Sequence, residues 1–299
     1  MDLQIVNRKQ TKIKISIAGS SGSGKTYSAL LLAYGICNDW SKIAVVDTEN
    51  YSASFYAHLG KFNIINLTAP YTPERYNEAI KLCEAKGMEV IIVDSISHEW
   101  SGKGGCLEIH ENEMSKMRVP NSFTAWASVT PRHQQFIDSI IMSGCHVITT
   151  VRSKTEYVLT ERNGKTIPQK VGMAPITRDG FEYEVSVSFD LDQEHKAFCS
   201  KDRTGIFAEC MPFVITSETG RQLLNWSKGE QNPTGRETLV SRIANCHTIQ
   251  DLLKLYESSL PVRPEDKVEF EHQKKRLLIN KEVEKNINHN KTFSKNGTH

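Results

Sequence analysis

The sequence has no run of about 18 apolar residues, so it lacks a segment long enough to cross a bilayer as a helix. Its first residues enter an alternation of apolar and polar positions directly, without the apolar core of a secretory signal peptide. These two absences argue against an integral membrane protein and an exported one. We therefore expect a cytoplasmic protein with no membrane partner.

Cysteine pairs and a strong excess of charge are also missing. The seven cysteines contain no CxxC pair, and several lie in apolar stretches, which is typical of reduced, buried thiols in a cytosolic protein. Because the formal net charge is only +2, any nucleic-acid surface must be a local patch. His133 and His146 lie too far apart in the sequence to suggest a metal site.

The sequence does contain an alternation of apolar runs with helical patterns. This alternation is typical of an α/β fold in which helices flank a mainly parallel sheet. A length of 299 residues leaves room for one large domain and a small appendage. The expected strands are 12–18, 43–47, 62–67, 89–94 and 145–151, and the expected helices are 26–37, 73–86, 130–143 and 217–226.

The pattern changes after residue 151. An Asn-Gly pair at 163–164 lies between two β-prone stretches, which indicates a hairpin. Strict alternation over 183–191 predicts an antiparallel or edge strand, and we expect a second hairpin through 196–200.

A polar linker at 227–235 separates this core from a helical C-terminal piece. There Thr248 is expected to begin one helix, and a charged helix is expected from Pro264 to about Glu284. The composition thus predicts three parts. They are a core at 1–228, a small helical extension at 229–285 and a disordered tail, rich in Asn and Lys, at 286–299.

The strongest local signal is a complete match to G-x-x-x-x-G-K-[ST] between an expected strand and an expected helix. In such a loop the glycines let successive backbone N–H groups approach phosphate oxygens, and the helix directs its positive end at the same anion. The sequence therefore predicts an ATP-binding loop. The residues expected to hold the nucleotide are Gly19, Ser20, Ser21, Gly22, Ser23, Gly24, Lys25, Thr26 and Tyr27.

Three side chains carry the expected phosphate and metal chemistry. Lys25 neutralises the β- and γ-phosphates, and the Thr26 hydroxyl ligates Mg²⁺. Asp94 ends the apolar run VIIVD, and in a P-loop fold such an acid holds the Mg²⁺ or its water. An acid that ends a strand is more often a simple cap, but the P-loop about 70 residues before it favours the metal role.

The segment AVVDTE at 44–49 resembles the strand and turn that carry the catalytic glutamate of RecA-like ATPases. This resemblance implies that Glu49 polarises the attacking water. Glu99, five residues after Asp94, is the competing candidate, and Glu49 as an ordinary surface acid is the third interpretation.

The segment SKDRTG at 200–205 looks like the Lys-x-Arg-x-Gly hairpin of the RecA, RadA and DnaB superfamily. In that group the basic pair reaches across a subunit interface to the γ-phosphate of the neighbour. The resemblance therefore implies that Lys201 and Arg203 act in trans, that the chain forms a ring or filament, and that hydrolysis is weak without assembly or DNA. A solvated basic hairpin is the alternative.

Over about residues 12–228 the chain resembles a phage and prophage group of RecA-like ATPases, of the AAA family and related to single-strand annealing and recombination proteins. The resemblance implies a RecA-like P-loop core and the cytoplasm of a bacterium or an infected host. Unlike bacterial RecA, the chain has no glutamine after the strand 147–150, where Thr150 and Arg152 stand instead. The segments that carry the resemblance are VDTENYSASFYA (46–57), PYTPERYNEAI (70–80), VDSISHEW (93–100), FTAWASVTPRH (123–133), VRSKTEYVL (151–159), KVGMAPITRDGFEYE (170–184) and SKDRTGIF (200–207).

A basic insert at 152–178 contains six basic residues and two acids, a local balance of +4. In RecA-like proteins the loop at this place faces single-stranded DNA, which implies phosphate contacts from the basic side chains and a base stacked on Tyr157. The alternative is an ordinary exposed hairpin, with Tyr157 covering the edge of the core. The expected nucleic-acid contacts are Arg152, Lys154, Tyr157, Arg162, Lys165, Lys170 and Arg178.

Three functions follow from these patterns. The first is an ATP-dependent, single-stranded-DNA-binding factor of phage-type recombination or annealing. The second is a nucleotide-controlled assembly or switch protein that regulates a protein partner without contacting DNA. The third, a small-molecule kinase, fits less well, because such kinases carry several arginines in a lid, whereas the hairpin at 200–205 favours assembly.

Overall fold

The computed structural model of the chain describes residues 11–162, 165–208, 210–229 and 236–295. The chain divides into two compact units. The first comprises Met1–Ala208 and Pro212–Glu230, and the second comprises Glu209–Met211 and Gln231–His299.

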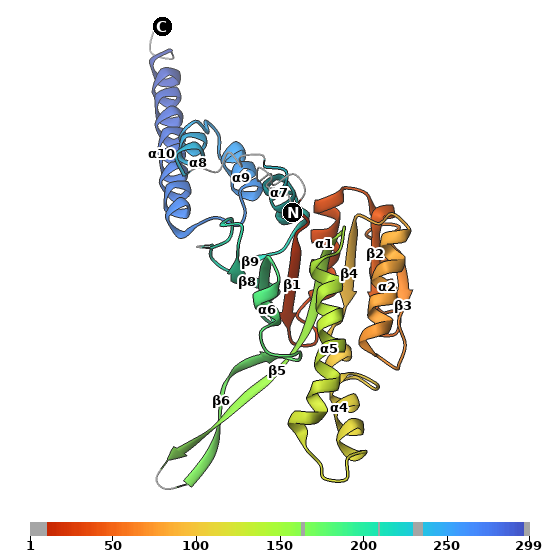
Figure 1. The fold of residues 1–299 in the computed structure, drawn as a ribbon. Helices are drawn as coiled ribbons and strands as arrows, with labels where there is room; N and C mark the ends of the chain where they lie inside the picture. The colour runs from red at the N-terminus through yellow and green to blue at the C-terminus, as the bar shows by residue number, and fades with distance from the viewer. Residues whose placement is uncertain (1–10, 163–164, 209, 230–235, 296–299) are drawn as a thin grey trace, which may run out of the picture. The chain divides into compact units, whose positions relative to one another are not determined.

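The first unit is built around one sheet, which is parallel through its centre (Figure 1). Its strands are β1 (Lys14–Gly19), β2 (Ile43–Asp47), β3 (Asn63–Asn66), β4 (Val90–Asp94), β5 (His146–Arg162), β6 (Lys165–Pro175), β7 (Val187–Leu191), β8 (Lys196–Asp202) and β9 (Phe213–Val214). Among the described residues the strand order is β3-β2-β4-β5-β1-β7-β8-β9, and β6 pairs with β5 outside this order. Runs of Ile and Val form the central strands because they are buried on both faces.

Helices cover both faces of this sheet. They are α1 (Lys25–Cys37), α2 (Pro73–Ala85), α5 (Ser122–Ile141) and α7 (Ser217–Ser227). Because successive side chains of a strand point to opposite faces, Val45 packs in the cluster that contains α1 and α7 residues, whereas Ala44 and Val46 pack in the cluster that contains α2 and α5 residues. The sheet is therefore the middle layer of three.

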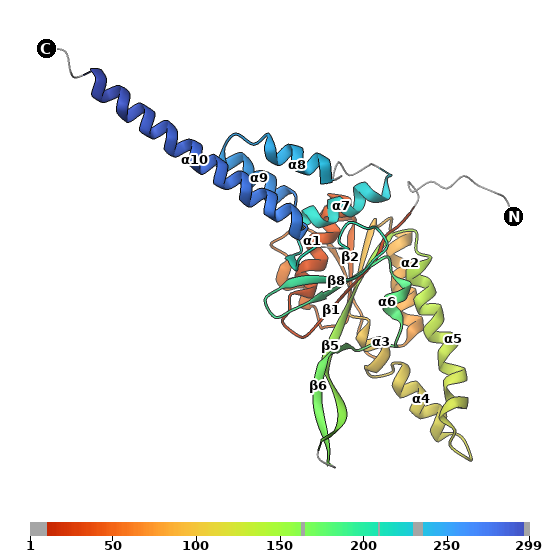
Figure 2. The same cartoon turned by 90° about the vertical axis from the view of Figure 1, so that its left-hand side faces the viewer.

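Shorter helices connect these layers. They are η2 (Trp40–Lys42), η3 (Ser52–Tyr56), α3 (Ser97–Ser101), α4 (Cys106–Ser115) and α6 (Phe181–Glu184). The pair β5–β6 and the end of α5 that lies beside α4 project beyond the same side of the sheet (Figure 2).

The hairpin predicted around residues 163–164 is confirmed by the pairing of its strands. β5 and β6 are antiparallel, with a register that runs from Ser153 opposite Pro175 to Arg162 opposite Lys165. The expected strand 145–151 continues into this hairpin, so one strand runs from the centre of the sheet to the hairpin tip. The second hairpin is confirmed by the antiparallel pairing of β7 with β8.

Helix α5 begins at Ser122 and not at Thr130, where we expected it. Its N-cap is Asn121, whose side-chain oxygen accepts a hydrogen bond from the backbone N of Thr124 at 3.1 Å. Pro131 therefore lies inside the helix and not at its start. The helix continues through this proline because burial of its apolar face on both sides of it outweighs the lost hydrogen bond.

The expected strand 183–191 is wrong in its first part, and its expected antiparallel pairing is confirmed on one side only. Phe181–Glu184 is helical, and β7 begins only at Val187. β7 is also not an edge strand, because it is parallel to β1 and antiparallel to β8. Ser188 shows why the alternation was misleading: it is only 4% exposed, so this polar position does not mark a face in water.

The second unit consists of α8 (Arg236–Ala244), α9 (Ile249–Ser258) and α10 (Pro264–Lys295), which share a small apolar core. The predicted start of α9 is present, because Thr248 Oγ1 accepts a hydrogen bond from Asp251 N at 3.0 Å. α10 continues past Glu284 into the stretch 286–299, for which the composition predicts disorder.

The predicted fold class is confirmed. The chain has an α/β core in which helices flank a mainly parallel sheet, and a helical C-terminal extension. None of the described helices combines the length and the apolar character that a membrane span needs.

Candidate nucleotide-binding site

The glycine-rich loop joins β1 to α1. Gly22 and Gly24 have φ values of +81° and +87°, a left-handed conformation that residues with a Cβ rarely adopt. A Cβ on Gly24 would also lie 3.1 Å from Nδ1 of His195. The two glycines therefore let the loop turn into α1, whose first backbone N–H groups have no acceptor within the helix.

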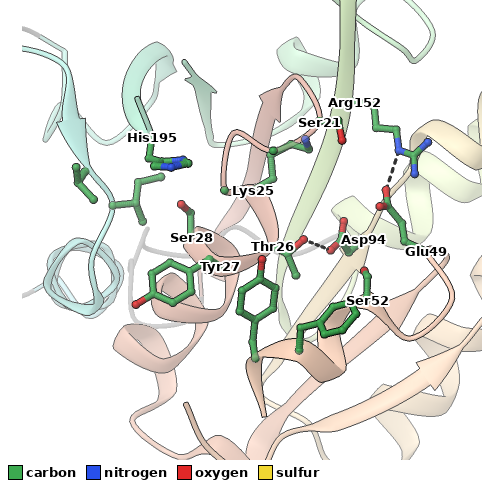
Figure 3. Close-up of a pocket in the computed structure, with 16 residues that line it drawn as sticks. Ser21, Lys25, Thr26, Tyr27, Ser28, Glu49, Ser52, Asp94, Arg152 and His195 are labelled. Atoms are coloured by element: carbon green, nitrogen blue, oxygen red, sulfur yellow. Dashed lines mark hydrogen bonds and ion pairs between the residues drawn. The ribbon is translucent and has the colours of Figure 1, made fainter. Parts of the chain in front are cut away.

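Side chains from α1, β4 and β5 meet beneath this loop (Figure 3). Thr26 Oγ1 donates a hydrogen bond to Asp94 Oδ2 at 2.6 Å, and Thr150 Oγ1 donates one to Asp94 Oδ1 at 2.5 Å. Lys25 Nζ donates to the backbone oxygen of Ser20 at 2.7 Å. The sheet thus brings Asp94 into direct contact with the start of α1.

Burial works against both charges of this site. Asp94 is 2% exposed, and burial raises the pKa of its carboxyl although two hydroxyl groups donate to it. Burial also lowers the pKa of Lys25, an effect that the charges of Asp94 and Glu49 oppose. A hydroxyl and a carboxylate oxygen 2.6 Å apart are the hard ligands that Mg²⁺ prefers, so Thr26 and Asp94 fit this ion.

Glu49 follows β2 and lines the same cavity. Its Oε1 accepts a hydrogen bond from Nε of Arg152 at 2.7 Å, and this bond raises the pKa of Arg152 (Figure 3). Glu99, the competing candidate for the catalytic base, is 1% exposed, contacts His133 and does not line the cavity. Of the two acids, Glu49 faces the space in which a phosphate can lie.

The cavity has a volume of about 480 Å³, which is within the usual range for small-molecule sites. Its lining includes the loop and the charged side chains of Glu49, Asp94 and Arg152. It also includes the rings of Tyr27, Phe55 and Tyr56. Tyr27 and Tyr56 have ring centroids 5.8 Å apart, and such rings offer the apolar faces on which a nucleobase stacks.

Two contacts to the loop had no signal in the sequence. Gln193 Nε2 donates to Ser20 Oγ at 2.7 Å, and His195 Nδ1 lies 3.0 Å from the backbone oxygen of Ser23. Both residues belong to the turn between β7 and β8. Because β7 is the neighbour of β1 in the sheet, the turn after β7 supports the loop after β1.

The segments that follow β2 and β4 are tied to each other. Thr48 Oγ1 accepts a hydrogen bond from Ser95 N at 2.9 Å and lies 2.7 Å from Nδ1 of His98. The His98 ring stacks on Tyr71 with a centroid distance of 4.9 Å. His98 therefore packs locally, and its contacts hold the backbone directly after Asp94.

The structure divides the seven expected nucleic-acid residues into three groups. Arg152 lies in the nucleotide cavity. Lys154 and Arg178 line a second cavity of about 760 Å³, which also contains Trp100 and lies at the base of the hairpin. The structure does not describe the side chains of the other four residues, so these four predictions lie outside its described part. They are Tyr157, Arg162, Lys165 and Lys170.

Lys201 and Arg203 do not line the nucleotide cavity of their own chain. Lys201 Nζ donates to the backbone oxygens of Glu182 and Tyr183, and Arg203 Nη2 donates to the same oxygen of Tyr183 at 2.9 Å. The two basic side chains thus lie together at the end of β8, next to α6.

Comparison with known proteins gives one family match. The model of a family described as an AAA domain matches residues 11–236, which is more than half of the chain. No curated protein matches the sequence. Among solved structures, a KaiC-like protein from the hyperthermophilic archaeon Pyrococcus horikoshii is similar at 15% identity over 64% of this chain and 79% of that chain, with a TM-score of 0.36.

Proposed function

The chain belongs to the AAA domain family, and from this premise we propose that it binds Mg·ATP beneath the loop 19–26 and hydrolyses it. The contact between Thr26 and Asp94 carries the proposal. It joins the residue after the loop lysine to a buried acid at the end of β4, which is the pair of oxygen ligands that a nucleotide-bound Mg²⁺ requires.

In the proposed complex, backbone N–H groups of the loop and of the first turn of α1 bind the phosphates. Lys25 exchanges the Ser20 carbonyl for phosphate oxygens and neutralises part of their charge. Thr26 and Asp94 hold Mg²⁺, which when bound offsets the charge of both the phosphates and the buried carboxylate. Tyr27, Phe55 or Tyr56 contacts the base.

We assign to Glu49 the orientation of the attacking water. A carboxylate in this position accepts the proton of the water as it attacks the γ-phosphate. Glu49 is engaged by Arg152, and the γ-phosphate is a stronger anionic partner for the same guanidinium. Nucleotide binding would therefore draw Arg152 to the phosphate and release Glu49 for the water.

The position of Lys201 and Arg203 supports action in trans. Because neither residue lines the cavity of its own chain, their proposed role at a γ-phosphate requires a second subunit. We therefore propose assembly into a ring or filament, with active sites at the subunit interfaces and slow hydrolysis by the isolated chain.

The proposed nucleic-acid partner is single-stranded DNA, in recombination or annealing of the phage type. Lys154 and Arg178 supply two positive charges to the cavity at the base of the hairpin, and Trp100 supplies an aromatic ring. Cationic groups that follow a backbone and rings that stack on bases are the features with which proteins bind single strands.

ATP hydrolysis measured against protein concentration, with and without single-stranded DNA, tests these proposals. We expect the rate per chain to rise with concentration, because the active site is completed at an interface, and to rise further with DNA. A rate per chain that neither rises with concentration nor responds to DNA would contradict the proposed assembly and the proposed DNA binding. The remaining function would be a nucleotide-controlled switch that regulates a protein partner. A chain with no affinity for Mg·ATP would remove the proposed function altogether.

A further inference from the structure

Three side chains of the types that bind metals meet among the helices that follow β4. Glu99 lies in α3, Cys106 is the first residue of α4, and His133 lies in α5. Their exposed fractions are 1%, 0% and 4%, and none of them lines the nucleotide cavity. Three separate helices thus contribute to one buried group, which we name the Glu99–Cys106–His133 cluster.

The ligand atoms of this cluster lie within 4.8 Å of one another. Cys106 Sγ is 3.0 Å from Glu99 Oε1 and 3.9 Å from His133 Nδ1. His133 Nδ1 is 3.1 Å from Oε1 and 3.2 Å from Oε2 of Glu99. Zinc–ligand bonds of about 2.0–2.3 Å in a tetrahedron place the ligand atoms about 3.3–3.6 Å apart. The distance between the two atoms of each pair therefore needs to change by only about 0.5 Å or less to accept the ion.

The cluster supplies three ligand side chains for a metal ion. Both carboxylate oxygens of Glu99 approach the same His133 nitrogen, so either oxygen can serve as the third ligand beside Cys106 Sγ and His133 Nδ1, and the fourth position of a tetrahedron is left for water. The indole of Trp100 lies edge-on to the His133 ring at a centroid distance of 5.5 Å. A metal ion that is this deeply buried and lies away from the nucleotide cavity would hold the three helices together and would not meet a substrate in that cavity.

The energetics of burial favour a cation at this place. Moving a carboxylate out of water is costly unless a positive charge compensates it. Burial raises the pKa of the Cys106 thiol, and the charge and hydrogen bond of Glu99 raise it further. A divalent ion would compensate both groups at once.

We propose that the Glu99–Cys106–His133 cluster is a structural site for a divalent metal ion of intermediate softness, best matched by Zn²⁺. One thiolate, one imidazole and one carboxylate suit Zn²⁺ and not Mg²⁺, which prefers oxygen ligands alone. Binding replaces the proton of the Cys106 thiol, which leaves to solvent, and forms bonds from zinc to sulfur, nitrogen and oxygen.

Such an ion would join α3, α4 and α5. α3 has only five residues and begins three residues after Asp94, so it depends on contacts outside itself for its position. Fixing Glu99 fixes this short helix and with it the backbone that Thr48 and His98 hold. The site would thus stabilise the segment next to the nucleotide cavity without contacting nucleotide.

Cobalt binding by the full chain tests the proposal. Chelator-treated protein is titrated with Co²⁺ in the absence of nucleotide, and thiolate-to-cobalt charge transfer is followed in the near ultraviolet. We expect the band to saturate at one Co²⁺ per chain, to be abolished by Zn²⁺ and to be unaffected by excess Mg²⁺. We also expect Zn²⁺ to raise the melting temperature of the chelator-treated protein.

The matched variants are Cys106→Ala and Cys83→Ala, since each removes one buried thiol. Cys83→Ala should keep the cobalt band. Cys106→Ala should lose the band and should bind Co²⁺ more than about tenfold more weakly, because the loss of a group outside the ligand set already weakens metal binding by about this factor. A band that survives in Cys106→Ala overturns the proposal. A folded wild-type chain without the band overturns it as well, so the test does not depend on the stability of either variant.

Discussion

Lys25 and Asp94 are opposite charges that the fold buries in one cavity. Burial disfavours the charged form of each side chain, as the lowered pKa of Lys25 and the raised pKa of Asp94 indicate. In the proposed complex, a bound triphosphate and its Mg²⁺ supply the counter-charge that each side chain lacks. The two residues should therefore matter more for binding than for the stability of the fold.

Replacing the loop lysine and the proposed base separates binding from hydrolysis. We expect Lys25→Ala to weaken Mg·ATP binding by about 2–3 kcal/mol, because charge-assisted hydrogen bonds to phosphate are lost. We expect Glu49→Gln to keep the affinity within a few-fold and to lower the single-turnover rate by about 10²–10⁴, the usual contribution of a general base. Titration with a fluorescent ATP analogue and single-turnover hydrolysis measure the two effects.

Glu78→Gln is the control for this pair, since it neutralises an exposed acid of α2. It should leave both binding and turnover unchanged. Retention of full turnover by Glu49→Gln would remove Glu49 from the proposed mechanism while leaving the nucleotide site intact.

His146 makes stability depend on pH independently of the cavity. Burial, assisted by the charges of Lys12 and Lys14, lowers its pKa to about 3. Its neutral Nδ1 accepts a hydrogen bond from Ile13 N at 3.1 Å. Since the unfolded chain takes up this proton near pH 6.5 and the folded chain does not, the stabilising effect is full above pH 6.5 and is lost as the pH falls towards 3.

We therefore expect the free energy of unfolding to contain a His146 contribution that falls by up to about 1.4 kcal/mol per pH unit below 6.5. Urea unfolding between pH 7 and pH 4 measures it. His146→Gln should be less stable at pH 7 and should lose this part of the slope. Parallel pH dependences for the two chains would contradict the assignment.

At the scale of elements, β5 connects the two proposed binding sites. Thr150 and Arg152 lie on it beside the nucleotide cavity, and the same strand continues into the hairpin with β6. A strand paired on both sides within the sheet is a stiff connection, so a shift of Arg152 on nucleotide binding would reach Lys154 at the base of the hairpin. Through this continuous strand, the binding of a nucleotide in the cavity would change the position of the hairpin.

Removing basic residues near the hairpin tip should weaken DNA binding through electrostatics. Each phosphate contact on a single strand contributes about 0.7 to the slope of log affinity against log salt. If Arg162, Lys165 and Lys170 each contact a phosphate, their joint replacement by alanine lowers the magnitude of this slope by about 2. Binding of a labelled single strand at several salt concentrations measures the slope.

Replacement of Lys61, Lys81 and Lys86 by alanine is the control, because it removes the same charge from exposed positions away from the hairpin. That variant should keep the salt slope of the wild type. Equal slopes in all three proteins would place the DNA, if it binds, away from the hairpin tip.

At the scale of the whole molecule, the proposed active site needs two chains. One chain supplies the loop and Glu49, and its neighbour supplies Lys201 and Arg203. Two variants that are inactive for different reasons should then complement each other. A mixture of Glu49→Gln and Arg203→Ala chains should regain up to about a quarter of the wild-type rate, because one interface type in four combines an intact Glu49 with an intact Arg203.

ATPase assays of the two variants, alone and at equal mixture, check this expectation. Glu49→Gln mixed with wild type shows how far an inactive neighbour slows an intact site. A mixture that stays as inactive as its components, under conditions where the wild type assembles, would count against action in trans.

Local sequence determined most of the secondary structure and the identity of the loop. β2 has the bounds 43–47 that its apolar run predicted, and the bounds of α1 and α2 differ by one residue from the expected ones. These elements were predictable because hydrophobic periodicity and glycine conformation act over a few neighbouring residues. The start of α5 and the position of β7 were not, since distant segments bury their side chains.

The sequence by itself therefore determined the α/β fold class and the place of the glycine-rich loop between a strand and a helix, because each depends on short-range patterns. The tertiary structure alone decided that Arg152 pairs with Glu49, that His195 supports the loop, and that Glu99 lies with Cys106 and His133. These contacts join residues from 7 to 172 positions apart. No local pattern encodes them, because strand order and helix packing determine which of the distant side chains meet.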